Sequence, residues 1–367
     1  MRNIARFTPN WFTTGMGTGI TALGAYLLPG GPSWLKEAGT GLWLFNVVLV
    51  SVLSILMVAR LILDRGAVRA ILRDPVQSMF IGAIPMAITT VVNGFVLMGP
   101  QVFGPAAIAV AYPLWIGNVV IAVLSGIMVP YAMFAGQDHH LSRMTGVWLM
   151  PIVPAEVVAA SGGIIVPHLT SVGAERALTL VSLGLWAFSV PLAFLILGVL
   201  FLRLALHRLP PSDMAISTWI SLGTLGTGVM GLIGLGKSFP LVFGAAGSAM
   251  AGAASLGAMI LWGFGIWWLV MSILLTLHHV RRGLPFNLGW WGLTFPLGVF
   301  TAGTDLLYGT FNVPWLGVFA VAFYLMLASF WVLVGTRTVM FLARPSKASA
   351  ETAAPDAESL GIELPAG

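Results

Sequence analysis

Ten stretches of mostly apolar residues divide the chain, and they constrain its fold more than any other feature. A helix needs about 20 apolar residues to cross the hydrocarbon core of a membrane. The ten stretches are close to that length, so the sequence predicts an all-α polytopic membrane protein with ten transmembrane helices. They run over residues 11–28, 40–63, 77–98, 106–134, 146–167, 176–206, 214–236, 247–277, 288–308 and 313–342.

Composition excludes the soluble classes of protein. Of the 367 residues, 58% are hydrophobic and 8% are charged, whereas a soluble domain carries about 25% charged residues. That leaves too little polar surface to cover a globule of this length. The chain has no Cys, which excludes disulfides, thiol catalysis and cysteine-ligated metals. We therefore expect no metal, no cofactor and no nucleic-acid partner.

Basic residues orient the predicted helices. With the N-terminus inside the cell, only Lys36, Arg176 and Lys237 of the 17 Lys and Arg residues fall on the outer side. This asymmetry follows the positive-inside rule and predicts that both termini are cytoplasmic, in a bacterial inner membrane. Residues 1–342 form the predicted transmembrane domain. Residues 343–367 are rich in Ala, Pro, Ser and Glu, which predicts a disordered cytoplasmic tail.

Two patterns recur about every 70 residues. In odd-numbered spans a bulky residue precedes a helix-breaking residue by six positions, and the pattern predicts pore-lining breaks. The pairs are Trp11 with Gly17, Met79 with Pro85, Trp148 with Pro154 and Trp290 with Pro296, while Trp219 precedes Gly226 by seven. Even-numbered spans carry Leu-Trp-x-Phe at residues 42–45, 185–188 and 261–264. Five tandem hairpins around a central pore account for both patterns; chance in a Trp-rich chain is the alternative.

Breaks in the inner helices favour a conduit for anions. Broken helices are tolerated in a membrane where they line a cavity, and the positive end of a half-helix attracts an anion. The competing interpretation is that small residues only let helices pack closely. Glu156 is the most informative polar residue, because a carboxyl group at this depth faces a cavity or a partner. It either couples transport to protons or makes a neutral hydrogen bond between helices.

Three segments resemble the tellurite-resistance/dicarboxylate transporter family, within the slow-anion-channel superfamily. They are residues 7–20 (FTPNWFTTGMGTGI), residues 148–154 (WLMPIVP) with 159–163 (AASGG), and residues 290–298 (WWGLTFPLG). The first segment is nearer to the malate permease and sulfite efflux branch. The resemblance implies ten helices in five hairpins around a pore, a homotrimer, and a gating phenylalanine at Phe295.

The leading functional prediction is transport of a small anion, such as malate or another C4-dicarboxylate, through a pore gated by Phe295. The alternatives are a sulfite or tellurite efflux transporter and a passive anion channel. An intramembrane enzyme is disfavoured, because only Glu156 and Asp305 are acidic residues within the spans and no His lies there. A structural scaffold would not account for breaks confined to the inner helices.

Overall fold

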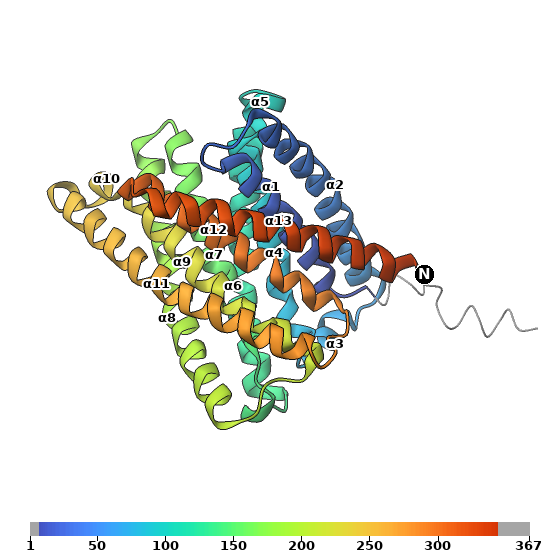
Figure 1. The fold of residues 1–367 in the computed structure, drawn as a ribbon. Helices are drawn as coiled ribbons and strands as arrows, with labels where there is room; N and C mark the ends of the chain where they lie inside the picture. The colour runs from blue at the N-terminus through green and yellow to red at the C-terminus, as the bar shows by residue number, and fades with distance from the viewer. Residues whose placement is uncertain (1–6, 344–367) are drawn as a thin grey trace, which may run out of the picture.

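The computed structural model describes residues 7–343, and this part of the chain is almost entirely helical, without strands (Figure 1). The predicted tail lies outside the described residues except for Ala343, which ends the last helix. Seven helical segments are long and apolar enough to cross a membrane. The ten-helix arrangement therefore stays a prediction.

Five long helices form an outer layer. In the segments that contain α2, α6 and α13 only 28% of the most apolar stretch is buried, and the exposed side chains are large and apolar. That surface fits contact with lipid tails. The outer helices are α2 (Ser33–Leu63), α6 (Ala106–Gly136), α8 (Val172–Leu206), α11 (Gly247–Val280) and α13 (Pro314–Ala343).

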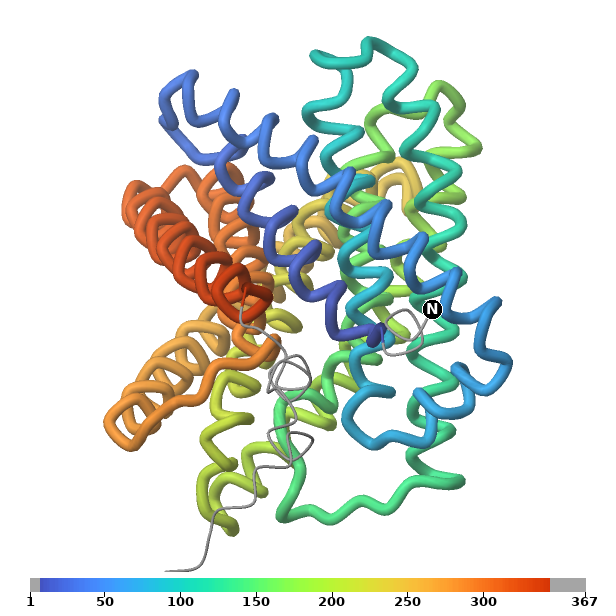
Figure 2. The backbone as a smooth tube through the Cα atoms, turned by 90° about the vertical axis from the view of Figure 1, so that its right-hand side faces the viewer, coloured from blue at the N-terminus to red at the C-terminus, as the bar shows by residue number. Residues whose placement is uncertain are grey.

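Five shorter helices form the inner layer, and most of their residues are buried. Each contacts the outer helix that follows it, as α1 contacts α2 (Figure 2). They also contact one another in the closed cycle α1–α4–α7–α9–α12–α1. The inner helices are α1 (Phe12–Leu27), α4 (Ala83–Leu97), α7 (Pro154–Ile165), α9 (Ile220–Gly236) and α12 (Phe295–Phe311).

A short 3₁₀ segment leads into each inner helix. These segments are η2 (Pro9–Trp11), η3 (Ser78–Gly82), η5 (Gly146–Leu149), η7 (Ser212–Trp219) and η9 (Leu288–Leu293). All five bulky residues of the first repeat pattern lie in these lead-in segments. The remaining short elements are α3 (Ala67–Arg73), α5 (Gly99–Phe103), α10 (Phe239–Phe243), η4 (Leu141–Arg143), η6 (Val166–His168) and η8 (Gly244–Ala246).

The predicted helix breaks occur at the prolines and not at the glycines. Pro154 and Pro296 stand in the first turn of α7 and α12, where proline costs no hydrogen bond. Helices α1 and α9 instead run uninterrupted through Gly17 and Gly226, so a break at these two positions is wrong. A Cβ at Gly226 would lie 2.5 Å from the Phe300 backbone nitrogen. These glycines therefore serve close packing.

Tryptophans on the outer helices bind each repeat to the next. Trp43 on α2 donates to the Val91 carbonyl on α4, and Trp115 on α6 donates to the Val158 carbonyl on α7. Trp186 on α8 donates to the Gly228 carbonyl on α9, and Trp262 on α11 donates to the Thr304 hydroxyl on α12. Trp331 on α13 closes the cycle by donating to the Thr18 hydroxyl on α1. Three of these five donors, Trp43, Trp186 and Trp262, belong to the second repeat pattern.

Side chains near the ends of outer helices hold the parts of the chain that precede the lead-in segments. Arg60 donates to the Phe7 carbonyl, Arg203 to the Ser142 carbonyl at 2.7 Å, and His279 lies 3.0 Å from the Pro210 carbonyl. Gln137, directly after α6, donates to the Leu72 carbonyl at 2.6 Å. These bonds satisfy backbone oxygens that no helix could satisfy, and they fix the segments around the cavity described next.

Candidate functional site

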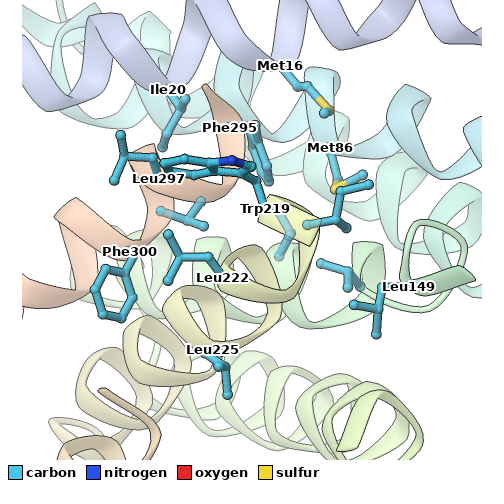
Figure 3. Packing of buried hydrophobic residues seen from close by; sticks show 14 of the residues in the cluster. Met16, Ile20, Met86, Leu149, Trp219, Leu222, Leu225, Phe295, Leu297 and Phe300 are labelled. Atoms are coloured by element: carbon cyan, nitrogen blue, oxygen red, sulfur yellow. The ribbon is translucent and has the colours of Figure 1, made fainter. Parts of the chain in front are cut away.

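A cavity of about 300 Å³ lies where the five inner helices begin. Each inner unit contributes at least one buried apolar side chain to its lining, among them Met16, Met86, Val153, Ile220 and Phe295. Figure 3 shows Phe295 beside Met16 and Met86 within this apolar cluster. The cavity is therefore built by all five repeats, and it lies on the axis of the cycle of inner helices.

The polar lining of the cavity is sparse and carries no positive charge. The lining residues include Asn10, Thr13, Ser217 and Asn287, with Asp213 as the only charged one. No Lys, Arg or His lines this cavity. The sequence patterns did not point to these residues as a group, because their common position depends on how the lead-in segments meet.

Phe295 stands at the inner end of the cavity. The lining reaches Val153, Phe295 and Gly223. One helical turn further along, Glu156 has 0% and Thr227 has 1% of its surface exposed. A Phe ring in this position can close a narrow path by bulk and by excluding water.

Glu156 is buried next to this end of the cavity. Its Oε1 lies 2.8 Å from the Thr227 hydroxyl on α9, and its Oε2 has no hydrogen-bond partner within the described residues. The Thr227 hydroxyl is also 2.8 Å from the Gly223 carbonyl. A hydroxyl has one proton to donate, so Thr227 cannot donate to both acceptors. If it donates to Gly223, the carboxyl group must supply the proton of the other bond.

The predicted pore-lining residues divide into two groups. Phe295 and Pro296 line the cavity, whereas Gly17, Pro85, Pro154, Glu156 and Gly226 do not. All five of these lie in the inner helices around its inner end.

The two glycines of that group contact α12 or its lead-in segment: Gly17 faces Trp291, and Gly226 faces Phe300. The Pro85 carbonyl accepts a bond of 2.9 Å from Asn118 on α6.

Positive helix ends surround the inner part of the cavity. Helices α4, α7 and α12 begin at Ala83, Pro154 and Phe295, beside the lining residues Met86 and Val153. The first backbone N–H groups of a helix carry a partial positive charge. The site can therefore attract an anion without a basic side chain.

Two pairs of adjacent histidines, His139 with His140 and His278 with His279, lie outside the central cavity. Within residues 7–343 no three His, Asp or Glu side chains converge as ligands. His139 lies 2.6 Å from the Gln137 side-chain oxygen, and His279 contacts backbone carbonyls. His139 and His279 are thus held by neighbouring protein groups.

The fold and the cavity define a multi-pass helical membrane protein whose inner helices enclose a site suited to a small anion. The chain matches the voltage-dependent anion channel family over residues 6–339, and it belongs to that family. The resemblance found in the three sequence segments is confirmed.

Curated relatives share nearly the whole chain. The sulfite efflux pump of Trichophyton rubrum is 35% identical over 343 residues, covering 92% of this chain and 91% of the relative. An uncharacterised transporter of Methanocaldococcus jannaschii is 30% identical over 336 residues, covering 91% and 93%. The sulfite efflux pump of Saccharomyces cerevisiae is 22% identical, covering 84% and 80%. The similarity to the sulfite efflux branch is thus confirmed.

Proposed function

We propose that this protein exports sulfite, carried as the singly charged hydrogensulfite ion, through a central pathway closed by Phe295. The single observation that carries the pathway is the cavity lined by apolar residues from every inner unit and ending at Phe295. The substrate rests on the sulfite efflux pumps that are 35% identical to this chain. These relatives favour sulfite over the malate-like substrate predicted from the sequence.

The charge of the cavity supports a singly charged substrate. The cost of moving an ion out of water rises steeply with its charge, and an unpaired charge in an apolar site is costly. The cavity offers only helix ends and a few polar side chains as compensation. Hydrogensulfite needs less compensation than the sulfite dianion, and a C4-dicarboxylate dianion would need more than this lining supplies.

Glu156 is the proposed proton-coupling residue. Its carboxyl group lies next to the end of the pathway and shares Thr227 with the Gly223 carbonyl. A protonated carboxyl group donates to Thr227 and does not repel a passing anion. A proton released or taken up there would link transport to pH.

The membrane arrangement is part of the same proposal. Helices α1, α7 and α12, with their lead-in segments, cross the membrane along with the seven long segments, which makes ten spans in five hairpins. The closed cycle of contacts between the inner helices supports this arrangement. We further propose an inner-membrane location and a homotrimer. We also propose that both termini are cytoplasmic, because most Lys and Arg residues then lie on the inner side.

Counterflow into proteoliposomes tests the function. Purified protein is reconstituted, and uptake of labelled sulfite and of labelled malate is followed across a pH series. We expect sulfite to exchange rapidly and malate to exchange slowly, with faster sulfite exchange at the pH where hydrogensulfite is abundant. Malate exchange that equals or exceeds sulfite exchange would overturn the choice of substrate. Equal passage of Na⁺ or K⁺ would overturn anion selectivity.

A further inference from the structure

A second, smaller cavity of about 190 Å³ adjoins the central one. The two cavities share Val76, Val147 and Met214 in their walls. These shared side chains separate the two cavities by the width of one wall. In the proposed orientation the small cavity lies at the cytoplasmic end, where exported substrate arrives.

The small cavity carries the basic side chains that the central cavity lacks. Arg143, His139 and His140 line it, together with Asp138. Asp138 lies 3.7 Å from His140. Asp74, next to this wall, uses its carboxylate to accept the backbone N–H groups of Val76 and Gln77. Neither carboxylate forms an ion pair with the arginine.

Arg143 is exposed, and its guanidinium group is unpaired within the described residues. It ends η4, and its backbone N–H donates to the His140 carbonyl at 2.9 Å. Within residues 7–343 its side chain makes no hydrogen bond and no ion pair. A guanidinium group presents a planar set of donors that matches an oxyanion. Arg143 is thus free to bind one.

His139 also lines the small cavity, and neighbouring side chains hold its ring in place. The Gln137 amide nitrogen donates to the Leu72 carbonyl and to the Ser78 hydroxyl, so the Gln137 oxygen accepts from His139 Nε2 at 2.6 Å. The His139 ring also packs edge-on against Trp148 at 5.1 Å. Burial lowers the pKa of His139, and Asp138 only partly opposes this. Near neutral pH the permanent positive charge of the cavity is therefore Arg143.

We propose that this cavity is the capture site for the exported oxyanion, with Arg143 as its principal binding residue. The inference rests on the proposed function and adds a site to it. The anion binds first at the guanidinium group, where water still solvates it. It then passes between Val147 and Met214 into the central cavity. In this proposal the small cavity attracts the anion, and the central cavity selects which anion passes.

Arg143→Gln tests the site in the transport assay. We expect the half-saturating sulfite concentration to rise about fivefold, the effect of one partly exposed charge contact, while the maximal rate stays unchanged. Arg281→Gln is the matched control, because it removes one positive charge from the same side of the molecule and lines neither cavity. Arg143→Lys should recover part of the affinity. An equal effect of Arg143→Gln and Arg281→Gln would contradict the proposal, since it would indicate a general surface potential.

Thermal stabilisation by sulfite separates this proposal from the transport function. In detergent solution sulfite should raise the melting temperature of the wild-type protein and of Arg281→Gln, and should do so less for Arg143→Gln. If this holds but no sulfite crosses the membrane, the capture site stands and the proposed function fails. If sulfite crosses and Arg143→Gln behaves as wild type in both assays, the capture site is refuted and the function stands.

Discussion

Phe295 is one of the residues that line the inner end of the central cavity, and it is the proposed gate. Phe295 has 2% of its surface exposed and lines the cavity, while Phe300 on the same helix is buried away from it against Trp262 and Phe323. The two residues have the same chemistry and similar burial. Comparing the effects of substituting each residue therefore shows how much its position on the proposed pathway contributes to anion flux.

Phe295→Ala should raise anion flux rather than abolish it, because removing the ring opens the narrowest part of the proposed path. We expect at least about a tenfold increase, which corresponds to a barrier lower by about 1.4 kcal/mol. Phe300→Ala should lower the free energy of unfolding by about 3–5 kcal/mol without raising the flux. Anion flux through each folded variant, measured in proteoliposomes, tests both expectations. Unchanged flux in Phe295→Ala would refute the gate.

Glu156 is the second residue whose role a substitution can decide. Glu156→Gln keeps the shape of the side chain and its bond with Thr227, but it cannot take up or release a proton. If the carboxyl group couples transport to protons, the pH dependence of sulfite counterflow should flatten in this variant.

Thr227→Val is the control for Glu156, because it removes the bond and keeps the carboxyl group. A pH profile of Glu156→Gln that matches the wild type would show that Glu156 only joins α7 to α9. The alternative from the sequence, a neutral bond between helices, would then hold.

At the scale of elements, the tryptophans explain why neighbouring units stay together in lipid. Lipid tails are as apolar as the helices, so burial of apolar surface does not drive helix association there. Trp115 instead makes a directed bond of 2.9 Å to the Val158 carbonyl on the next inner helix. A tryptophan N–H makes one such bond at every junction between neighbouring units.

Trp115→Phe should lower the free energy of unfolding by about 1–2 kcal/mol, because it removes a buried hydrogen bond and a few ring atoms. Trp290→Phe is the matched control, since its indole N–H reaches only the Pro285 carbonyl of its own lead-in region. It should cost less than about 0.5 kcal/mol. Denaturant unfolding in detergent measures both. Equal losses in the two variants would contradict a special role for the junction bond.

The outer helices could be predicted closely from the sequence, and the inner ones less well. Predicted spans 106–134 and 313–342 correspond to α6, Ala106–Gly136, and α13, Pro314–Ala343. Predicted span 146–167 is instead a 3₁₀ segment, a turn and the short α7, Pro154–Ile165. A helix that faces lipid must be largely apolar and must satisfy most backbone groups within itself, because lipid supplies no hydrogen-bond partner. An inner segment can break, because neighbouring protein satisfies its backbone.

At the scale of the whole molecule, the number of membrane crossings is the open prediction. Helix α7 is short, so whether residues 146–167 cross the membrane decides the topology of everything that follows. The chain has no Cys, so single cysteines give labelling sites without background.

We expect a membrane-impermeant thiol reagent to label Thr170→Cys from outside intact cells and to label Ser142→Cys only after permeabilisation. The two residues flank the η5–α7 segment, and both side chains are exposed. Labelling of both from the same side would contradict the ten-span arrangement. Transport by each variant, measured in parallel, confirms that the labelled protein is folded.

The sequence by itself determined that this is a helical membrane protein of an anion channel family, where its lipid-facing helices lie, and that a motif recurs about every 70 residues. These properties follow from local apolarity and local patterns. Only the tertiary structure decided that Gly17 and Gly226 serve packing rather than helix breaks, that Glu156 meets Thr227, and that Arg143 stands beside the central cavity. Such pairings join segments far apart in the chain, and no local pattern specifies which side chains meet there.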